Sequence, residues 1–203
     1  MTGYSTPHDW QAFAVAPAGL APKLFALIDR EISHAQAGRP AAVLAKMNSL
    51  SNQAVIDKLY EASAAGVRIE LIVRGVCCLR PGVPGLSENI RVVSIVDRFL
   101  EHSRVLAVGI GREGGEEVYI SSADWMTRNL NRRVELMCPV GDPGLRRLLL
   151  QLLELNLRDS VKARELRPNG RYERVSAQGT PLRSQFEAAA IPDWKRSAAS
   201  AER

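Results

Sequence analysis

The sequence predicts an α/β fold in which helices flank a mixed β-sheet. Two observations support this. Segments of helical periodicity alternate with short apolar segments in the first half of the chain, and a glycine-rich turn later joins two strand-like segments. The 203 residues, 46% hydrophobic and 24% charged, have the composition of an ordinary globular domain. We expect a lead-in over residues 1–17, one domain over 18–175 and a loosely ordered tail over 176–203.

The first half of the domain is predicted to run helix, strand, helix, strand. Apolar residues at helical spacing begin at Leu20, and Gly38 and Pro40 end that helix. Ser51 or Asn52 can cap the second helix. The second strand begins with alternation and becomes fully apolar, as a central strand does. The predicted elements are helices over 20–37 and 53–65 and strands over 41–47 and 67–73.

Residues 74–89 form an unusually long loop. They contain three glycines and two prolines, which exclude a regular element. Loops of this length in a compact domain are usually functional.

The second half adds a hairpin and a long helix. A turn rich in glycine, from Gly109 to Gly115, joins the two hairpin strands. Asp142 can cap the helix, with Pro143 at its first position. The predicted strands are 90–96, 103–110, 117–121, 133–140 and an edge strand at 172–175. The predicted buried stripe of the helix is Leu145, Leu148, Leu149, Leu152 and Leu153.

The charge admits anionic partners. The net charge is +5 and the pI near 9.4, with the excess in arginine, which captures phosphate or carboxylate bidentately. A basic surface without a ligand stays open on composition alone. Aromatic residues make up 5%, which disfavours a stacking platform for single-stranded nucleic acid.

Other features of the sequence indicate the cellular compartment of the protein. No apolar run approaches the roughly 18 residues of a membrane span, and no secretory signal is visible. Cys77, Cys78 and Cys138 form neither a disulfide framework nor a metal-ligand spacing, so we interpret them as buried small hydrophobic residues. We expect a cytoplasmic protein, with peripheral attachment to the inner membrane left open.

One histidine stands in a chemically suggestive setting. His8 in the lead-in and His34 on a polar helix face are expected to be solvated. His102 precedes a strand, with Arg104 two residues later, and Ser122-Ala-Asp124 follows the next strand. Histidine ordinarily titrates near neutrality and can attack or protonate at phosphorus. The arginine can hold a phosphate oxygen, and the hydroxyl and carboxylate can orient the ring.

Further polar residues lie at the ends of two neighbouring strands. Arg74 ends a central strand, where ligands of open α/β sheets bind, although a loop cation paired with Glu88 or Asp97 is an open alternative. Lys46 and Asn48 end an earlier strand, where a structural lysine is equally expected.

The order from His102 to Asp124 resembles one half-site of the phospholipase D superfamily. There, His-x-Lys precedes Gly/Ser-x-Asn on the neighbouring strand; here the elements are His-x-Arg and Ser-x-Asp at residues 102–104 and 122–124. The resemblance implies a phospholipase D-like half with a mixed β-sheet flanked by helices.

Longer stretches resemble the C-terminal domain of bacterial polyphosphate kinase, family 1. The most specific is the loop Cys77-Cys-Leu-Arg-Pro-Gly-Val-Pro-Gly85, and the similarity extends from Thr2 to about Tyr172. The other similar stretches are residues 45–50, 60–63, 71–91, 98–104 and 118–129.

This resemblance implies reversible transfer of the ATP γ-phosphoryl group to polyphosphate through a phosphohistidine, with Mg²⁺. Matched residue by residue, His102 falls on the second histidine, which assists proton transfer, and Arg104 occupies the basic place of the half-site. Arg74 and Arg133 fall on arginines that hold nucleotide phosphates. The downstream polar element is matched by Ser122 and Asp124.

The family's phosphoacceptor histidine belongs to a preceding domain that this sequence does not contain. The resemblance therefore implies ATP or ADP and polyphosphate as ligands, the N-terminal half of the kinase or a second copy as protein partner, and Mg²⁺ ligands outside this chain. No specific nucleic-acid partner is implied.

Four interpretations stay open from the sequence. The chain is a kinase part, in a fragment or a split enzyme, that is inactive alone. It is a homodimeric phospholipase D-like phosphodiesterase or transferase that brings two copies of His102 together. It is a non-catalytic module that binds polyphosphate or nucleotides. It is an inert truncated product.

Overall fold

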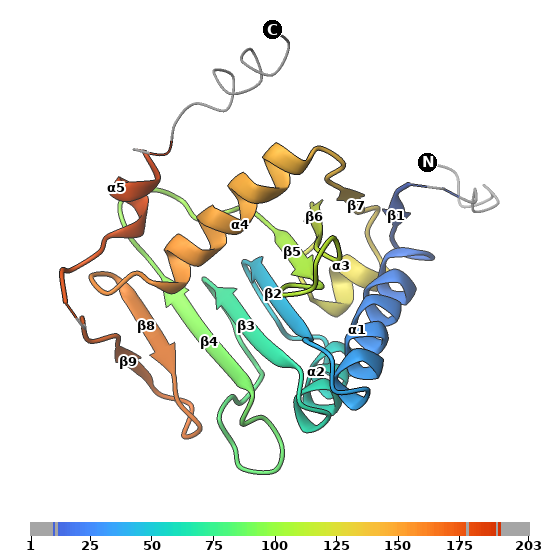
Figure 1. Cartoon of the computed structure of the whole chain (residues 1–203), viewed down its shortest axis with the longest axis horizontal. Coiled ribbons are helices and arrows are strands. Elements are labelled where there is room, and N and C mark those ends of the chain that lie inside the picture. Colours follow the sequence, from blue (N-terminus) through green and yellow to red (C-terminus); the bar gives the residue numbers. More distant parts are fainter. Residues whose placement is uncertain (1–9, 11, 178, 190, 192–203) are drawn as a thin grey trace, which may run out of the picture.

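The structure, a computed structural model, describes residues 10, 12–177, 179–189 and 191. These residues form one twisted sheet with helices on both faces (Figure 1). The strands are β1 (Ala14–Val15), β2 (Ala42–Met47), β3 (Arg68–Val73), β4 (Ile90–Ile95), β5 (Val105–Val108), β6 (Glu117–Ser121), β7 (Leu136–Pro139), β8 (Ala163–Leu166) and β9 (Tyr172–Arg174). The helices are α1 (Leu20–Gln36), α2 (Gln53–Ala64), α3 (Thr127–Asn131), α4 (Pro143–Leu157) and α5 (Ser184–Ala188).

The sheet is mixed, as the sequence predicts. Its strand order is β1-β7-β6-β5-β2-β3-β4-β8-β9. Strands β2, β3 and β4 are parallel, and the other described neighbours are antiparallel. Parallel strands need crossover helices, and α2 supplies the one between β2 and β3.

The topology brings many loops to one end of the sheet, which we call the carboxyl end. It is defined by the ends of β2, β3 and β4. Strand β5 begins there, because Val105 pairs with Lys46, and β6 ends there, because Ile120 pairs with Val105. Strand β8 also begins there, since Ala163 pairs with Ile95. Ligands of open α/β sheets bind at such ends.

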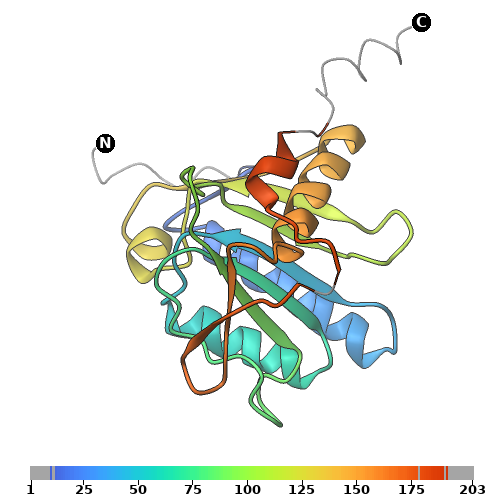
Figure 2. The same cartoon turned by 90° about the vertical axis from the view of Figure 1, so that its left-hand side faces the viewer.

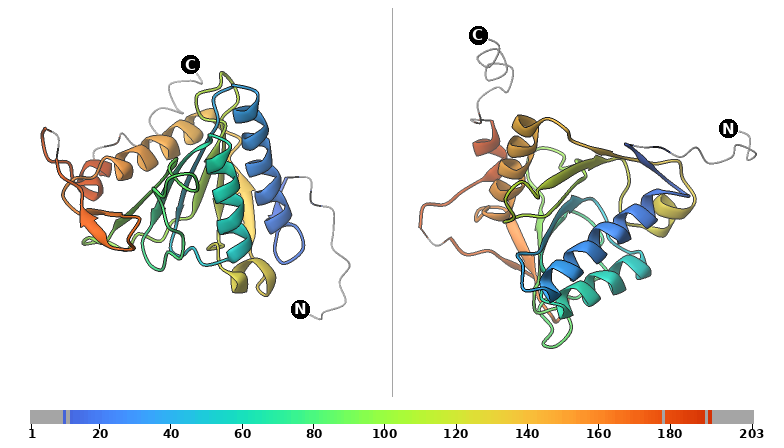
Figure 3. Two further views of the ribbon diagram at one scale, coloured as in Figure 1. Left: turned by 90° about the horizontal axis from the view of Figure 1, so that it is seen from below. Right: turned by 45° about the vertical axis from the view of Figure 1, so that its right-hand side comes forward.

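Helices α1 and α2 cover one face of the sheet (Figure 2, Figure 3). Leu24 and Ile28 of α1 and Leu59 of α2 are fully buried, and they pack in one cluster with residues of β2, β3 and β4. The Asn52 side chain caps α2 by accepting a hydrogen bond from the Val55 amide at 3.1 Å. Apolar spacing and capping thus act as the sequence predicts.

Helix α4 crosses the opposite face. Asp142 caps it, as predicted, by accepting a hydrogen bond from the Leu145 amide at 2.8 Å. The buried residues of α4 are Leu153, Asn156 and Leu157. The predicted stripe is therefore displaced. Its other leucines are only half-buried, because the helix contacts the sheet mainly through its C-terminal half.

The loop over residues 74–89 is ordered and docked on the domain. Buried Ser87 donates a hydrogen bond to the Arg80 carbonyl and accepts one from the Val83 amide. The Tyr60 hydroxyl accepts a hydrogen bond from the Arg80 amide at 2.8 Å. Gly82 and Gly85 have φ values of 69° and 73°, which favour glycine at these two positions.

Several predictions about the ends of the domain differ from the structure. The lead-in contributes β1, and α3, β8 and α5 were not predicted; α5 lies within the expected tail. Of the strand predicted over residues 133–140, only β7 is a strand in the structure. His8 lies outside the described residues. His34 is half-buried, and its Nδ1 atom is enclosed without a hydrogen-bond partner among the described residues, so it is not simply solvated.

The cysteine prediction is also partly wrong. Cys77 and Cys138 are half-buried, but Cys78 is exposed. Burial raises the pKa of the Cys77 thiol to about 11, so this group stays a thiol at neutral pH.

Candidate functional site

The predicted site residues come from loops that converge at the carboxyl end. His102 and Arg104 precede β5, Asp124 follows β6, and Arg74 follows β3. The antiparallel pairing of β5 with both β2 and β6 places their loops together, because β5 begins where the other two strands end.

A bidentate ion pair forms the base of the site. Arg104 donates from Nε to Asp124 Oδ1 at 3.2 Å and from Nη2 to Asp124 Oδ2 at 3.0 Å. Asp124 is 5% exposed, and its Oδ1 also accepts hydrogen bonds from the main-chain amides of Asn48 and Ser49. A carboxylate with this many charge-assisted contacts holds its arginine in one orientation.

The third nitrogen of this guanidinium holds the histidine loop. Arg104 Nη1 donates to the His102 carbonyl at 2.7 Å and lies 2.9 Å from Nδ1 and 3.2 Å from Nε2 of the imidazole. A guanidinium only donates and a neutral imidazole has one acceptor nitrogen, so only one of these two ring contacts can be a hydrogen bond. The imidazole itself is exposed. The ring is thus held by Arg104 and remains exposed, so a ligand can reach it.

This geometry changes the roles expected for Arg104 and Asp124. The expectation was that Arg104 holds a phosphate oxygen and that the carboxylate orients the ring. Instead, Arg104 is engaged with Asp124 and orients His102 itself, and Asp124 acts on the ring only through Arg104.

The network continues to the predicted phosphate-binding residue. Arg74 Nε donates to the Asn48 side-chain oxygen at 2.7 Å, and the Asn48 amide contacts Asp124. Arg74, Asn48, Asp124, Arg104 and His102 therefore form one connected set. Arg74 does not pair with either acid that the sequence offered: Asp97 binds Arg183, and Glu88 accepts from the Gly85 amide.

Ser122 belongs to a different cluster. Its hydroxyl donates to Glu135 Oε2 at 2.5 Å and accepts from the Leu136 amide at 3.0 Å. The other oxygen of Glu135 accepts from Asn129 at 2.7 Å. The predicted contact of Ser122 with the imidazole is therefore absent among the described residues. The hydroxyl instead ties the start of β7 to the loop that carries Asp124.

Arg133 lies beside this cluster, in the segment between α3 and β7. Its side chain is exposed, and its amide donates to the Arg128 carbonyl. No contact of Arg133 with the set around His102 is found among the described residues.

Lys46 is structural. Its Nζ atom donates to Glu101 at 2.5 Å and to Asn156 of α4 at 2.7 Å, and the residue is 8% exposed. It therefore anchors the residue just before His102 to α4, as the structural alternative for this lysine predicts.

The sequence did not reveal a clamp on the loop that leads to His102. Arg183 donates to Asp97 from Nε and Nη2, at 2.8 and 2.5 Å. Gln185 accepts from the Phe99 amide and donates to the Phe99 carbonyl, and it also donates to Glu101. The hydrogen bonds from Arg183 hold the pKa of the Asp97 carboxyl below its usual range. These contacts span more than 80 residues of sequence, so no local signal reports them.

The described residues contain no group of three His, Cys, Asp or Glu side chains that could hold a metal ion. The carboxylates near His102 already bind cations: Asp124 binds Arg104 and Glu101 binds Lys46. We therefore derive no step through Mg²⁺ from this chain.

Comparison with known proteins decides the family. A family model described as "Polyphosphate kinase C-terminal domain 2" matches residues 13–185. The chain belongs to this family. Within polyphosphate kinases, it is 51% identical over 180 residues to the protein from Thermosynechococcus vestitus, covering 88% of this chain and 24% of that one. It superposes on the crystal structure of polyphosphate kinase from Porphyromonas gingivalis with a TM-score of 0.86 and 41% identity, covering 98% and 30% of the two chains.

The phospholipase D-like fold is confirmed as well. Nuc from Salmonella typhimurium, a phospholipase D family member, matches with a TM-score of 0.53 over 76% of this chain and 96% of Nuc. Its 14% identity supports the fold alone. The chain spans about a quarter of the length of the curated relatives that it matches. Among the described residues, no helix combines the length and apolar character that crossing a bilayer requires.

Proposed function

We propose that this chain forms one wall of the phosphoryl-transfer site of a polyphosphate kinase, which moves the γ-phosphoryl group between ATP and polyphosphate. The observation that supports this proposal is the connected set at the carboxyl end. It joins an exposed imidazole, His102, to a guanidinium, Arg74, through buried Asp124. The family membership supplies the reaction class.

In this proposal, Arg74 binds phosphate. Only its Nε is used by Asn48, so both Nη groups can donate to phosphoryl oxygens of a nucleotide. The hydrogen bond to Asn48 fixes the plane of the guanidinium. Such preorganised donors stabilise the charge on a transferring phosphoryl group without reorganisation.

His102 moves a proton. Both ring nitrogens lie near Arg104 Nη1, but only one can accept from it, and the other can exchange a proton with a phosphoryl oxygen. Arg104 is a positioning residue here, because each of its three guanidinium nitrogens already contacts Asp124 or His102. Arg133 can add a second phosphate contact from its exposed position.

The nucleophile and the metal are proposed to come from elsewhere. We infer that a phosphoacceptor histidine outside the sequence given completes the site. Mg²⁺ would be held by nucleotide phosphates and by ligands outside this chain, because Mg²⁺ is commonly bound by one or two carboxylates together with substrate phosphates.

A complementation assay tests the catalytic proposal. A relative's polyphosphate kinase, with its matching segment deleted, is mixed with this chain and ATP, and polyphosphate is measured. We expect synthesis to be restored, and the His102→Ala variant to lower it by about 100-fold or more. Ser103→Ala, an exposed neighbour in the same loop, is the matched control. Failure to restore synthesis, or equal activity of the two variants, would count against the proposal.

The phosphate-binding proposal has its own test on the chain alone. Arg74→Gln is expected to weaken ADP and ATP binding by about tenfold or more, because a charge-assisted contact is lost. Arg68→Gln changes the same residue type at the opposite end of β3 and should leave binding unchanged. Isothermal titration calorimetry with each nucleotide measures both.

A further inference from the structure

A basic pocket lies on the same end of the sheet, beyond β4. It has a volume of about 370 Å³ and is lined by Val96, Val161, Lys162, Arg164 and Arg174. Val96 follows β4, Lys162 precedes β8, and Arg174 ends β9. The antiparallel pairing of β8 with β4 and of β9 with β8 brings these residues to the carboxyl end.

The two arginines of the pocket face each other without a counter-ion. Arg164 and Arg174 are directly opposite in the β8–β9 pair. Like charges at opposed positions destabilise a sheet. Both side chains are exposed, and among the described residues neither has a carboxylate within ion-pair distance. Lys162, on the same side of β8, adds a third cation.

The neighbouring pair in the same two strands shows the contrast. Glu165 and Glu173 are also directly opposite and alike in charge. There, Arg167 bridges them, donating to Glu165 at 2.7 Å and to Glu173 at 2.8 Å, and Arg91 contacts Glu165 as well. The repulsion is thus neutralised internally on one face of the hairpin and left unneutralised on the other.

The wall of the pocket is held firmly. Buried Asp159 accepts three amide hydrogen bonds through Oδ1, from Val161, Lys162 and Ala163. Its Oδ2 accepts from the amide and hydroxyl of Ser184 at 2.7 and 2.8 Å. Asp97, the acid closest in sequence to Val96, is occupied by Arg183. The wall of the pocket is therefore preorganised. Asp97 also interacts electrostatically with Lys162, whereas Arg164 and Arg174 have no carboxylate partner among the described residues.

We propose that this pocket binds a segment of the polyphosphate chain away from the reacting end. The inference rests on the proposed function and extends it along the sheet. Ser94, which pairs with Arg164, donates to the Arg74 carbonyl at 3.1 Å. Strands β3 and β8 are two spacings apart, about 10 Å in all. A linear polyanion lying across the carboxyl end can contact Arg74 and the pocket at once.

The lining of the pocket favours polyphosphate over nucleic acid. Its apolar members are Val96 and Val161, and no aromatic side chain lines it. Single-stranded nucleic acid is usually held by bases stacked on aromatic rings. Closely spaced arginines suit a ligand in which every unit carries charge and none carries a base.

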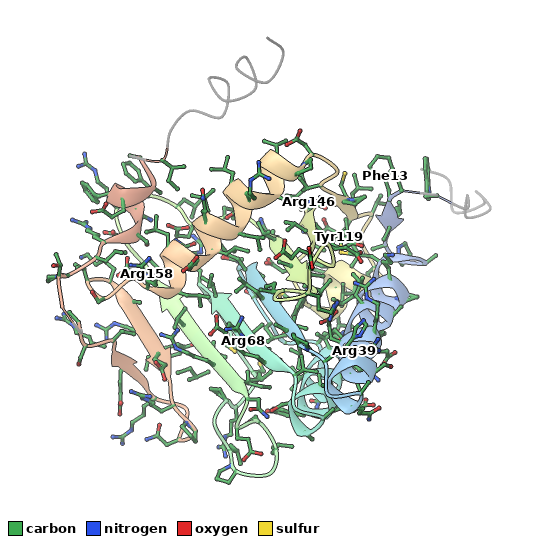
Figure 4. All side chains as sticks on the ribbon, viewed as in Figure 1. Phe13, Arg39, Arg68, Tyr119, Arg146 and Arg158 are labelled. Atoms are coloured by element: carbon green, nitrogen blue, oxygen red, sulfur yellow. The ribbon has the colours of Figure 1, made fainter. Side chains whose placement is uncertain are left out.

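The test compares two double variants. Arg164→Gln/Arg174→Gln removes the pocket pair, and Arg39→Gln/Arg68→Gln removes two exposed arginines at the opposite end of the sheet. The control pair lies away from β8 and β9 (Figure 4). Affinity is measured by calorimetry for long-chain linear polyphosphate, tripolyphosphate, ADP and a single-stranded oligonucleotide, over a range of salt concentrations.

We expect the pocket variant to bind long-chain polyphosphate about tenfold or more weakly, with a smaller salt dependence, while ADP binding is unchanged. The control variant should retain the affinity of the native chain. Equal losses in both double variants, or an equal loss for the oligonucleotide, would overturn the proposal in favour of unspecific polyanion binding. Failure of the proposed function appears differently, as ADP binding that is insensitive to Arg74→Gln.

Discussion

Two buried arginine–carboxylate pairs occupy opposite ends of the sheet. Arg112 binds Glu31 through two nitrogens at 2.8 and 2.7 Å, and Arg104 binds Asp124 at 3.2 and 3.0 Å. The two arginine side chains are 14% and 13% exposed. By geometry and burial, the pairs are almost the same.

They differ in their remaining partners. Apart from Arg30 Nε, which lies 3.9 Å from Glu31, the remaining partners of the first pair are main-chain groups: Arg112 donates to the Pro40 carbonyl, and Glu31 accepts from the Ala42 amide. The second pair also uses main-chain groups, but Arg104 ends on an exposed imidazole. A buried bidentate pair is therefore not a mark of a functional site. The mark is a titratable partner that the pair presents to solvent.

The largest expected effect on stability distinguishes a buried arginine–carboxylate pair from an exposed ion pair. Glu31→Gln leaves Arg112 buried without its carboxylate, and we expect the free energy of unfolding to fall by about 3–5 kcal/mol. Urea unfolding measures this. Asp29 lies on the same helix as Glu31 and is an exposed partner of Lys58 on α2. Asp29→Asn should cost under about 1 kcal/mol. A similar cost for both variants would show that burial does not decide the value of these pairs.

A similar loss of stability, here combined with a loss of function, is expected at the second pair. Asp124→Asn leaves Arg104 buried without its carboxylate, as Glu31→Gln does for Arg112, and should also cost about 3–5 kcal/mol. The substitution also frees His102 from its fixed position, so this variant should restore less polyphosphate synthesis in the complementation assay than the native chain does. The Glu31→Gln variant, where it is folded, should restore synthesis fully. The complementation assay measures both. Equal activity of the two variants would remove the functional distinction between the pairs.

The sequence predicts what depends on local pattern. Helix α2 and its Asn52 cap follow from apolar spacing and a side-chain oxygen three residues before Val55. The hairpin of β5 and β6 brings His102 near Asp124, and that proximity was predicted. The direction of the Arg104 contacts was not, because it depends on amides of residues 48 and 49, which only the sheet brings close.

Elements defined by distant contacts escaped prediction for the same reason. Helix α5 has five residues and no amphipathic pattern of its own, and it is fixed by Asp97, Phe99 and Asp159. Glu135 carries no local signal in the sequence, although its carboxylate accepts hydrogen bonds from Ser122 and Asn129. Its role is visible only when the loops on both sides of β7 are in place.

A third bidentate pair, Arg183 with Asp97, is expected to give the smallest effect, a local release of α5 in acid. Hydrogen bonds from Arg183 lower the pKa of Asp97. Burial raises the pKa of Asp159, but hydrogen bonds from Lys162, Ser184 and Ala163 outweigh it, so this pKa is also below its usual range. A carboxyl with a lowered folded pKa contributes stability above its unfolded pKa, and this contribution is lost as pH falls through the folded value.

The contacts of Asp97 with Arg183 and of Asp159 with Ser184 should thus keep their strength around neutral pH and weaken below about pH 4. Amide protection factors from hydrogen exchange report it: residues 184–187 should lose protection before residues 55–63 of α2 do. Arg183→Gln should show the same local loss at neutral pH, because Asp97 then lacks its main partner. If α5 and α2 lose protection together in both experiments, the segment that fixes the His102 loop is part of the global fold, and the third pair is structural like the pair of Glu31.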